Sequence, residues 1–257
     1  MLCLDVVQII CDFSDLRTQI NLIQTCKEYD EYLKIRKLNC CSNGTEIKIT
    51  QEIIQQKKFD KLQILYAYNN NKIKDVTHLQ NTLIELDCSS DCGIDQKGIC
   101  NLTKLQKLHA GNNSKITDVN HLQNTLIELA CYGDCVIDQK GISNLTKLQK
   151  LHVSNYSKIT DVNHLQNTLT ELYCCGNCGI DQKGISNLKI LQILNAGHNH
   201  KITDVNHLQN TLTELYCWYN CGIDQRGISE LKVLQKLDAY YNNKITDVTI
   251  TNKISES

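Results

Sequence analysis

The sequence repeats itself with a fixed period, and this constrains the fold more than any other feature. The tetrapeptide Ile-Thr-Asp-Val begins at Ile116, Ile159, Ile202 and Ile245, each 43 residues after the last. Each period contains two related halves that share the pattern Leu-x-x-Leu-x-small-x-x-Asn/Asp-x-x-Ile. A regular repeat of this length predicts a solenoid, in which equivalent segments of successive repeats stack beside one another.

Nine units follow this pattern, spaced alternately by 21 and 22 residues, and they predict a repeat domain over 62–249. They begin at Leu62, Leu83, Leu105, Leu126, Leu148, Leu169, Leu191, Leu212 and Leu234. In each unit, alternate side chains point inward along a short strand, and a small residue stands at the sixth position, as a tightly filled interior requires. The remaining chain is too short for full helices, so we expect turns and short 3₁₀ or helical pieces on the return side.

An Asn or Asp at the ninth position of most units is predicted to hydrogen-bond backbone groups where the strand turns away. These residues are Asn70, Asp91, Asn113, Asp134, Asn177, Asn199, Asn220 and Asn242. One unit departs from the pattern, because it carries Tyr156 at this position and Asn155 just before it. We expect a local shift of the turn there.

This pattern resembles the leucine-rich repeat family, and Ile-Thr-Asp-Val followed by a spaced leucine is similar to its short, internalin-like class. The resemblance implies an α/β solenoid with a parallel β-sheet on the concave face and short turns or 3₁₀ segments on the convex face. It also implies a protein target on the concave face. The chain has no proline, only three arginines and abundant Ile, Asn and Lys, so it also resembles repeat proteins of amoebae and giant DNA viruses.

Residues 1–34 do not fit the repeat, and their apolar residues recur at helical spacing, which predicts two or three short helices. Leu2-Cys-Leu-Asp-Val-Val-Gln-Ile-Ile-Cys-Asp-Phe13, followed by Thr25-Cys-Lys27, resembles an F-box. Cys3 stands where that family has proline, and Tyr29 stands near its usual tryptophan. The resemblance implies that this segment docks a Skp-type adaptor of cullin-type ubiquitin ligases through Leu2, Asp5, Val6, Ile10, Phe13 and Leu16. The alternative is a helical cap over the open end of the solenoid.

Two further segments complete the predicted domain organisation. Residues 35–61 resemble an irregular first repeat and a connecting segment, in which Thr50 to Lys58 form a longer return helix. Residues 250–257 form a C-terminal tail.

Recurrent cysteines and histidines are the candidates for chemistry. Cys88 and Cys92 recur as a pair in each period, and His78 recurs as His121, His164 and His207. Equivalent residues lie two strands apart, near 10 Å, which is too far to share one zinc ion or to form a disulfide. We therefore interpret them as framework residues and expect no metal, no cofactor and no enzymatic activity, since the chain also lacks known catalytic motifs.

Charge and cysteine content indicate the compartment and exclude some partners. Lys and Arg total 27 against 28 for Asp and Glu, so neither nucleic acid nor an anionic membrane is expected as a partner. Fifteen cysteines, an odd number, and a start without a basic signal region favour reduced thiols. We expect an intracellular protein, in the cytoplasm or in host cytoplasm if it is viral.

Aromatic residues gather at outward positions five, seven and eight of the last units, and they form the candidate partner-binding site. They are Tyr173, Tyr216, Trp218, Tyr219, Tyr240 and Tyr241. Clustered Trp and Tyr are the usual anchors of protein interfaces, although these rings could instead shield the end of the core. The favoured function is substrate recognition in a cullin-type ubiquitin ligase; the alternative is a stand-alone scaffold or host-interaction protein.

Overall fold

One short strand recurs in each repeat unit and begins two residues after the first leucine. The structure is a computed structural model that describes residues 3–40 and 49–247, and the chain forms unit 1 (Met1–His109) and unit 2 (Ala110–Ser257). Each repeat strand contains the second leucine of its unit, which points inward while its neighbours on the strand point outward. The predicted parallel architecture is confirmed.

In the described part of unit 1, four strands pair in parallel in chain order, and their central residues Leu38, Leu65, Leu86 and Leu108 are in register. The strands are β1 (Lys37–Asn39), β2 (Ile64–Tyr66), β3 (Glu85–Asp87) and β4 (Lys107–His109). The helices are α1 (Leu4–Asp12), α2 (Leu16–Ile23), α3 (Lys27–Tyr32), α4 (Gln51–Ile54) and α5 (Gln96–Ile99), with 3₁₀ turns at Lys57–Phe59 and Thr77–Leu79.

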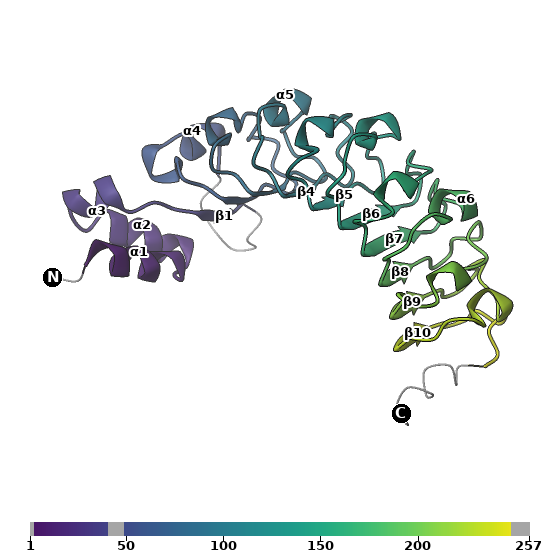
Figure 1. The fold of residues 1–257 in the computed structure, drawn as a ribbon. Coiled ribbons are helices and arrows are strands. Elements are labelled where there is room, and N and C mark those ends of the chain that lie inside the picture. Colours follow the sequence, from purple (N-terminus) through teal and green to yellow (C-terminus); the bar gives the residue numbers. More distant parts are fainter. Residues whose placement is uncertain (1–2, 41–48, 248–257) are drawn as a thin grey trace. The chain divides into compact units, whose positions relative to one another are not determined.

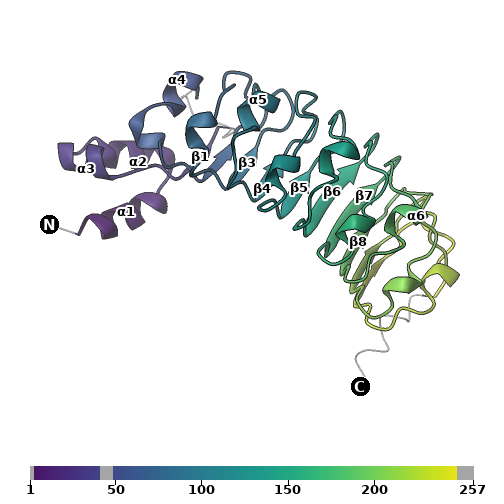
Figure 2. The ribbon, with the colours of Figure 1, turned by 45° about the horizontal axis from the view of Figure 1, so that its top comes forward.

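Unit 2 continues the pattern with a further run of parallel strands, which lie side by side on one face of the unit while the return turns lie on the other (Figure 1; Figure 2). The strands are β5 (Glu128–Ala130), β6 (Lys150–Ser154), β7 (Glu171–Cys175), β8 (Ile193–Asn195), β9 (Glu214–Tyr216) and β10 (Lys236–Asp238). The return side carries α6 (Gln182–Ile185) and 3₁₀ turns at Asn120–Leu122, Lys140–Ile142, Asn163–Leu165, Asn206–Leu208 and Arg226–Ile228.

The core follows the sequence pattern closely. In the unit that begins at Leu191, the two leucines, the small Ala196 and the terminal Ile202 are fully buried. Burying a leucine side chain contributes about 1.5–3 kcal/mol relative to leaving it exposed, and this gain recurs in every repeat. Opposite charges also alternate across the outward positions of neighbouring strands, as in the ion pair of 2.7 Å between Lys150 Nζ and Glu171 Oε1.

The turn after the strand takes two alternating forms. In the units that begin at Leu105, Leu191 and Leu234 the ninth residue is buried. It acts there as predicted: Asn199 Nδ2 donates to the carbonyl oxygens of Cys174 and Ile180 at 3.0 and 3.1 Å. In the second half of a period the prediction is wrong, because Asn177 at this position is exposed. There the buried tenth residue, Cys178, accepts a hydrogen bond from the amide of Ile180 at 3.4 Å.

The unit that begins at Leu148 shows the predicted local shift. Its left-handed residue is Tyr156 (φ 67°), at the ninth position, whereas the other units place this conformation at the eighth, as Asn112 does (φ 56°). Tyr156 points into solvent and is 75% exposed, and Ser157 takes the buried place that follows it. A tyrosine is costly in this backbone conformation, which asparagine and glycine adopt more readily.

The N-terminal segment forms the three short helices that its apolar spacing predicts. Asp15 caps α2 by accepting a hydrogen bond from the amide of Thr18 at 3.0 Å. Gln8, which is almost buried, bonds both backbone groups of Lys34 at 2.9 Å and so ties α1 to the segment that leads into β1. The prediction of a single return helix over Thr50 to Lys58 is wrong, because this segment forms α4 and a separate 3₁₀ turn at Lys57–Phe59.

Candidate functional site

The outward positions of the last three repeats carry the candidate site in unit 2. Trp218 and Tyr240 occupy the seventh position of their units, and Tyr219 and Tyr241 occupy the eighth, just beyond the ends of β9 and β10. We call these four residues, together with His198 at the eighth position of the preceding unit, the aromatic surface. Their backbones are anchored by the repeat: the amide of Tyr219, for example, donates to the carbonyl oxygen of Tyr240 at 2.7 Å.

The rings of the aromatic surface contact one another across three successive repeats. Tyr219 stacks on His198 with ring centroids 4.6 Å apart and on Tyr241 with centroids 5.4 Å apart. Trp218 meets His198 and Tyr219 edge to face, and Tyr240 does the same with Tyr219 and Tyr241. Contact with Tyr241 also raises the pKa of Tyr240, through a hydrogen bond between the two side chains. The surface is therefore one continuous aromatic group.

The indole of Trp218 packs against a glycine of the preceding repeat. A Cβ atom built on Gly197 would lie 2.2 Å from Cε2 of Trp218, so the indole lies directly on this backbone. Gly111 and Tyr132 form an equivalent pair earlier in unit 2, where the corresponding distance to the ring is 2.4 Å. Gly197 was not singled out from the sequence, but its signal is present there: a glycine at the seventh position of one unit precedes an aromatic residue at the same position of the next.

Three aromatic residues of this surface have the left-handed backbone. The φ angles of His198, Tyr219 and Tyr241 are 58°, 54° and 54°, at the position where two other repeats of unit 2 have glycine. Bulky residues are uncommon in this conformation, which costs about 1–3 kcal/mol per residue. His198 was missed from the sequence because only Tyr and Trp were considered as anchors.

The aromatic surface stays accessible to a partner. Tyr219, Tyr240 and Tyr241 are 42%, 60% and 63% exposed, and Trp218 is half-buried. The alternative role, in which these rings shield the end of the core, disagrees with the burial of the last strand. Its inward residues Leu237 and Ala239 stay partly exposed to solvent. The equivalent Leu215 and Cys217 of the preceding strand are fully buried.

The two remaining predicted partner-binding residues lie at the fifth position, on the strands themselves. Tyr216 donates a hydrogen bond of 2.7 Å to Glu214 and accepts one of 2.7 Å from Lys236 Nζ, and this contact raises the pKa of Lys236. Tyr173 stacks on His152 with centroids 4.1 Å apart, and burial raises its pKa. Both tyrosines lie on the same face of the sheet as Trp218, but no described ring contact joins them to the aromatic surface.

In unit 1, the predicted adaptor-binding residues fall on one helix and at the start of the next. Val6 and Ile10 lie on one side of α1, and Phe13 directly follows the helix; they are 42%, 47% and 90% exposed. Asp5, on the same helix, accepts a hydrogen bond from the hydroxyl of Tyr32. Leu16 begins α2 and is half-buried. Leu2 lies outside the described residues.

The recurrent cysteines occupy the core of the described repeats. Cys174, Cys178, Cys217 and Cys221 are fully buried, and burial raises the pKa of each thiol, to about 12 for Cys217. They are free thiols, and within residues 3–40 and 49–247 no three His, Cys, Asp or Glu side chains come together as a metal site would require. These cysteines act as small apolar residues.

The recurrent histidines belong to the return side, as the sequence indicates. Nε2 of His164 donates to the carbonyl oxygen of Ile142 at 3.2 Å, and His207 makes the equivalent bond to Ile185 at 3.1 Å. Burial lowers the pKa of both histidines below the ordinary value of 6.5. Each imidazole is therefore held in its neutral form at neutral pH.

These two histidines predict a specific pH dependence of stability. Because their folded pKa is lowered, the unfolded chain binds protons first as the pH falls. The free energy of unfolding is expected to be highest above about pH 6.5 and to fall between about pH 6.5 and pH 5. In the double variant His164→Gln, His207→Gln, which keeps a hydrogen-bond donor but removes the titrating groups, urea unfolding should show a smaller fall over this range. An unchanged fall would contradict the assignment.

In the part of the chain that the structure describes, no helix combines the length and apolar character needed to cross a bilayer.

Comparison with known proteins places the fold. An internalin (inlF) of Listeria monocytogenes matches with a TM-score of 0.50 and 23% sequence identity, over 89% of this chain and 80% of the internalin. A second internalin of that bacterium (TM-score 0.46, 24% identity, 79% of each chain) and a leucine-rich repeat protein of Leptospira interrogans (TM-score 0.43, 22% identity, 75% of this chain and 64% of that protein) also match. Neither a family model nor a curated protein matches the sequence. The fold of this chain is the leucine-rich repeat solenoid.

Proposed function

We propose that this chain is a protein-recognition module whose aromatic surface holds a target protein. The observation that carries the proposal is that Trp218, Tyr219, Tyr240 and Tyr241 form one contacting group while three of the four are at least 42% exposed. Tyr and Trp dominate the energetic centres of protein interfaces, since they bury a large area and lose few rotamers on binding. Such an accessible cluster fits a binding surface better than a structural role.

Backbone conformation supports this proposal. Tyr219 and Tyr241 hold the left-handed conformation at a cost, yet they are too exposed to recover that cost by burial in the free chain. Asparagine or glycine would serve the turn with less strain, as Asn112 and Gly133 do in other repeats. Local strain without a gain in stability is typical of functional positions.

We further propose that α1 docks a Skp-type adaptor, which would make the chain a substrate-recognition subunit of a cullin-type ubiquitin ligase. The supporting observation is the exposed apolar stripe of Val6, Ile9 and Ile10 on this helix and Phe13 at its C-terminal end, which are 42–90% exposed. These residues follow the i, i+3, i+4, i+7 spacing of a helix face that packs against a partner. The stripe belongs to unit 1 and the aromatic surface to unit 2, so the two contacts use different parts of the chain.

A stand-alone scaffold is the second candidate, with α1 to α3 as its N-terminal cap. The observation that favours it is the tight link from the helices to the first strand: Gln8 bonds the backbone of Lys34, and the amide of Ile35 donates to Lys58 at 2.8 Å. Leu33 and Ile35 are fully buried in this link. A cap accounts for these contacts but not for the exposed stripe on α1.

Target binding is tested by removing the rings that the proposal depends on. The double variant Trp218→Ala, Tyr219→Ala is expected to weaken capture of the target from a eukaryotic cytosolic extract by about a thousandfold, because each central aromatic anchor contributes about 2 kcal/mol or more. Its melting temperature should stay close to that of the intact chain, since both rings lie outside the core. Unfolding of the variant would instead show that these rings are structural.

The variant Gly197→Ala provides an independent test of target binding by the aromatic surface. The added methyl group should displace the indole of Trp218 while leaving every aromatic residue in the sequence. The matched control is Gly111→Ala, which should displace Tyr132 in the same way at a repeat outside the aromatic surface. Loss of capture in the first variant and its retention in the second would support the proposal, and equal loss in both would contradict it.

A further inference from the structure

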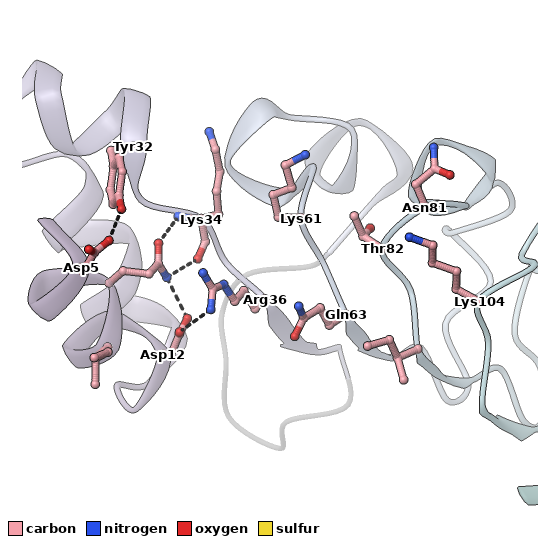
Figure 3. Close-up of a pocket in the computed structure, with 13 residues that line it drawn as sticks. Asp5, Asp12, Tyr32, Lys34, Arg36, Lys61, Gln63, Asn81, Thr82 and Lys104 are labelled. Carbon is pink, nitrogen blue, oxygen red and sulfur yellow. Dashed lines mark hydrogen bonds and ion pairs between the residues drawn. The ribbon is translucent and has the colours of Figure 1, made fainter. Parts of the chain in front are cut away.

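Unit 1 contains a cleft that neither the aromatic surface nor the apolar stripe of α1 explains. It has a volume of about 680 Å³. One side is lined by α1, the last residue of α3 and the segment that follows it, and the other by residues that precede strands β2, β3 and β4. Figure 3 shows these two walls facing one another. This volume is within the usual range of ligand-binding pockets.

The carboxylates in the cleft already have partners. Asp12 forms an ion pair of 3.3 Å with Arg36 and accepts a hydrogen bond of 2.8 Å from Gln8. Asp5 accepts a hydrogen bond from the hydroxyl of Tyr32. These contacts are drawn as dashed lines in Figure 3. One carboxylate charge of the cleft is therefore paired with Arg36, and the other carboxylate is hydrogen-bonded to a neutral hydroxyl.

Its lysines, in contrast, lack partners. Within the described residues, Lys61 and Lys104 are exposed at the cleft and form no hydrogen bond or ion pair. Lys34 Nζ is out of contact with solvent and also has no hydrogen-bond partner. An unpaired ammonium withdrawn from water is unfavourable, and its flexible side chain can turn toward an anion. The cleft consequently has an excess of unpaired positive charge.

The arrangement favours an extended anion over a single small one. Lys61 and Lys104 directly precede the first leucines of units whose strands lie two apart in the sheet, so their backbones are about 10 Å from each other. Between them lie the neutral hydrogen-bonding side chains of Gln63, Asn81 and Thr82. These groups suit a peptide backbone, and the lysines suit acidic side chains.

Aromatic content argues against nucleic acid. Binding of single-stranded nucleic acid uses aromatic side chains on which the bases stack. Among the described residues that line the cleft, Tyr32 is the only aromatic one, and its hydroxyl is already bonded to Asp5. We therefore propose that this cleft binds a short, extended, acidic segment of a protein partner. The cleft shares Ile9 with the apolar stripe and Asp5 with the predicted adaptor-binding residues, but its lysines belong to neither of the two proposed contacts.

The test uses a fluorescent glutamate-rich decapeptide as the probe and the full chain as the receptor. The double variant Lys61→Gln, Lys104→Gln is expected to weaken binding by about tenfold at low salt, because two partly exposed ion pairs are lost. The matched control Lys72→Gln, Lys97→Gln removes the same charge from exposed positions of unit 1 outside the cleft and should change the dissociation constant by less than about twofold. Equal weakening in both variants would overturn the proposal.

Two further variants distinguish a cleft from a diffuse charge effect. Asp12→Asn should strengthen peptide binding, because it releases Arg36 from its ion pair. Lys34→Met should weaken binding without lowering the melting temperature, because it removes an unpaired buried charge. Weaker binding by Asp12→Asn would overturn the proposal, and so would complete displacement of the peptide by an equal charge of inorganic phosphate or of an RNA oligonucleotide.

Discussion

Replacing Val6, Ile10 and Phe13 together by serine is expected to abolish co-purification of the chain with a Skp-type adaptor. The three side chains are 42%, 47% and 90% exposed, and a partner that buries them would gain about 1.5–3 kcal/mol for each large apolar side chain. Their joint loss, up to about 9 kcal/mol, is comparable with the whole free energy of a micromolar complex, which is about 8 kcal/mol. The measurement is co-expression of the full chain with the adaptor, followed by affinity purification and titration.

Two controls separate docking from folding in this experiment. The matched variant Tyr132→Ser, Tyr156→Ser removes exposed apolar side chains from unit 2 and should leave adaptor binding unchanged. The melting temperature of the triple variant should also be unchanged, because the helix packs through Val7 and Cys11, which are buried. An adaptor that still binds the triple variant would refute the docking of α1 and leave the cap as the role of these helices.

Gly184→Ala is expected to lower the free energy of unfolding by about 3 kcal/mol, the largest effect on stability that we predict. Gly184 lies buried in α6, and a Cβ atom there would stand 2.2 Å from the carbonyl oxygen of Thr160 in the preceding repeat. The neighbour is backbone, so it cannot turn aside as a flexible side chain would. Alanine favours a helix over glycine by only about 1 kcal/mol, which is too little to offset this overlap.

Urea unfolding measures this effect, and the adjacent Lys183→Ala provides the control. Lys183 lies in the same helix but points into solvent, so its replacement should change the stability by less than about 0.5 kcal/mol. The recurrence of the motif extends the prediction: a Cβ at Gly227, the equivalent residue of the next period, would lie 2.2 Å from the carbonyl oxygen of Thr203. Wild-type stability in Gly184→Ala would show that the turn can yield and would contradict the close approach.

The repeat pattern determined the fold of this chain almost completely. Alternation around the second leucine of each unit specifies which side chains face inward. The alternating spacing of 21 and 22 residues leaves one register in which equivalent leucines of neighbouring strands are paired, as Leu172 and Leu194 are. Tyr156 and Asn155 also revealed the shifted turn in advance, because a bulky residue stood where the pattern requires a small polar one. These features are local or periodic, so a single sequence contains them.

The tertiary structure decided what depends on contacts between repeats. The burial of Cys178 in place of Asn177 follows from how two turns pack together, and the pattern of a single unit does not contain that information. The inclusion of His198 in the aromatic surface, and the seat of Trp218 on Gly197, likewise depend on ring positions one repeat apart. The cleft in unit 1 is lined both by α1 and by residues as distant in sequence as Lys104. Its lysines are in excess because Asp5 and Asp12 already bond Tyr32 and Arg36, which only the structure shows. Periodicity fixes the framework because every repeat must bury the same face, whereas the sites arise from the residues that each repeat is free to vary.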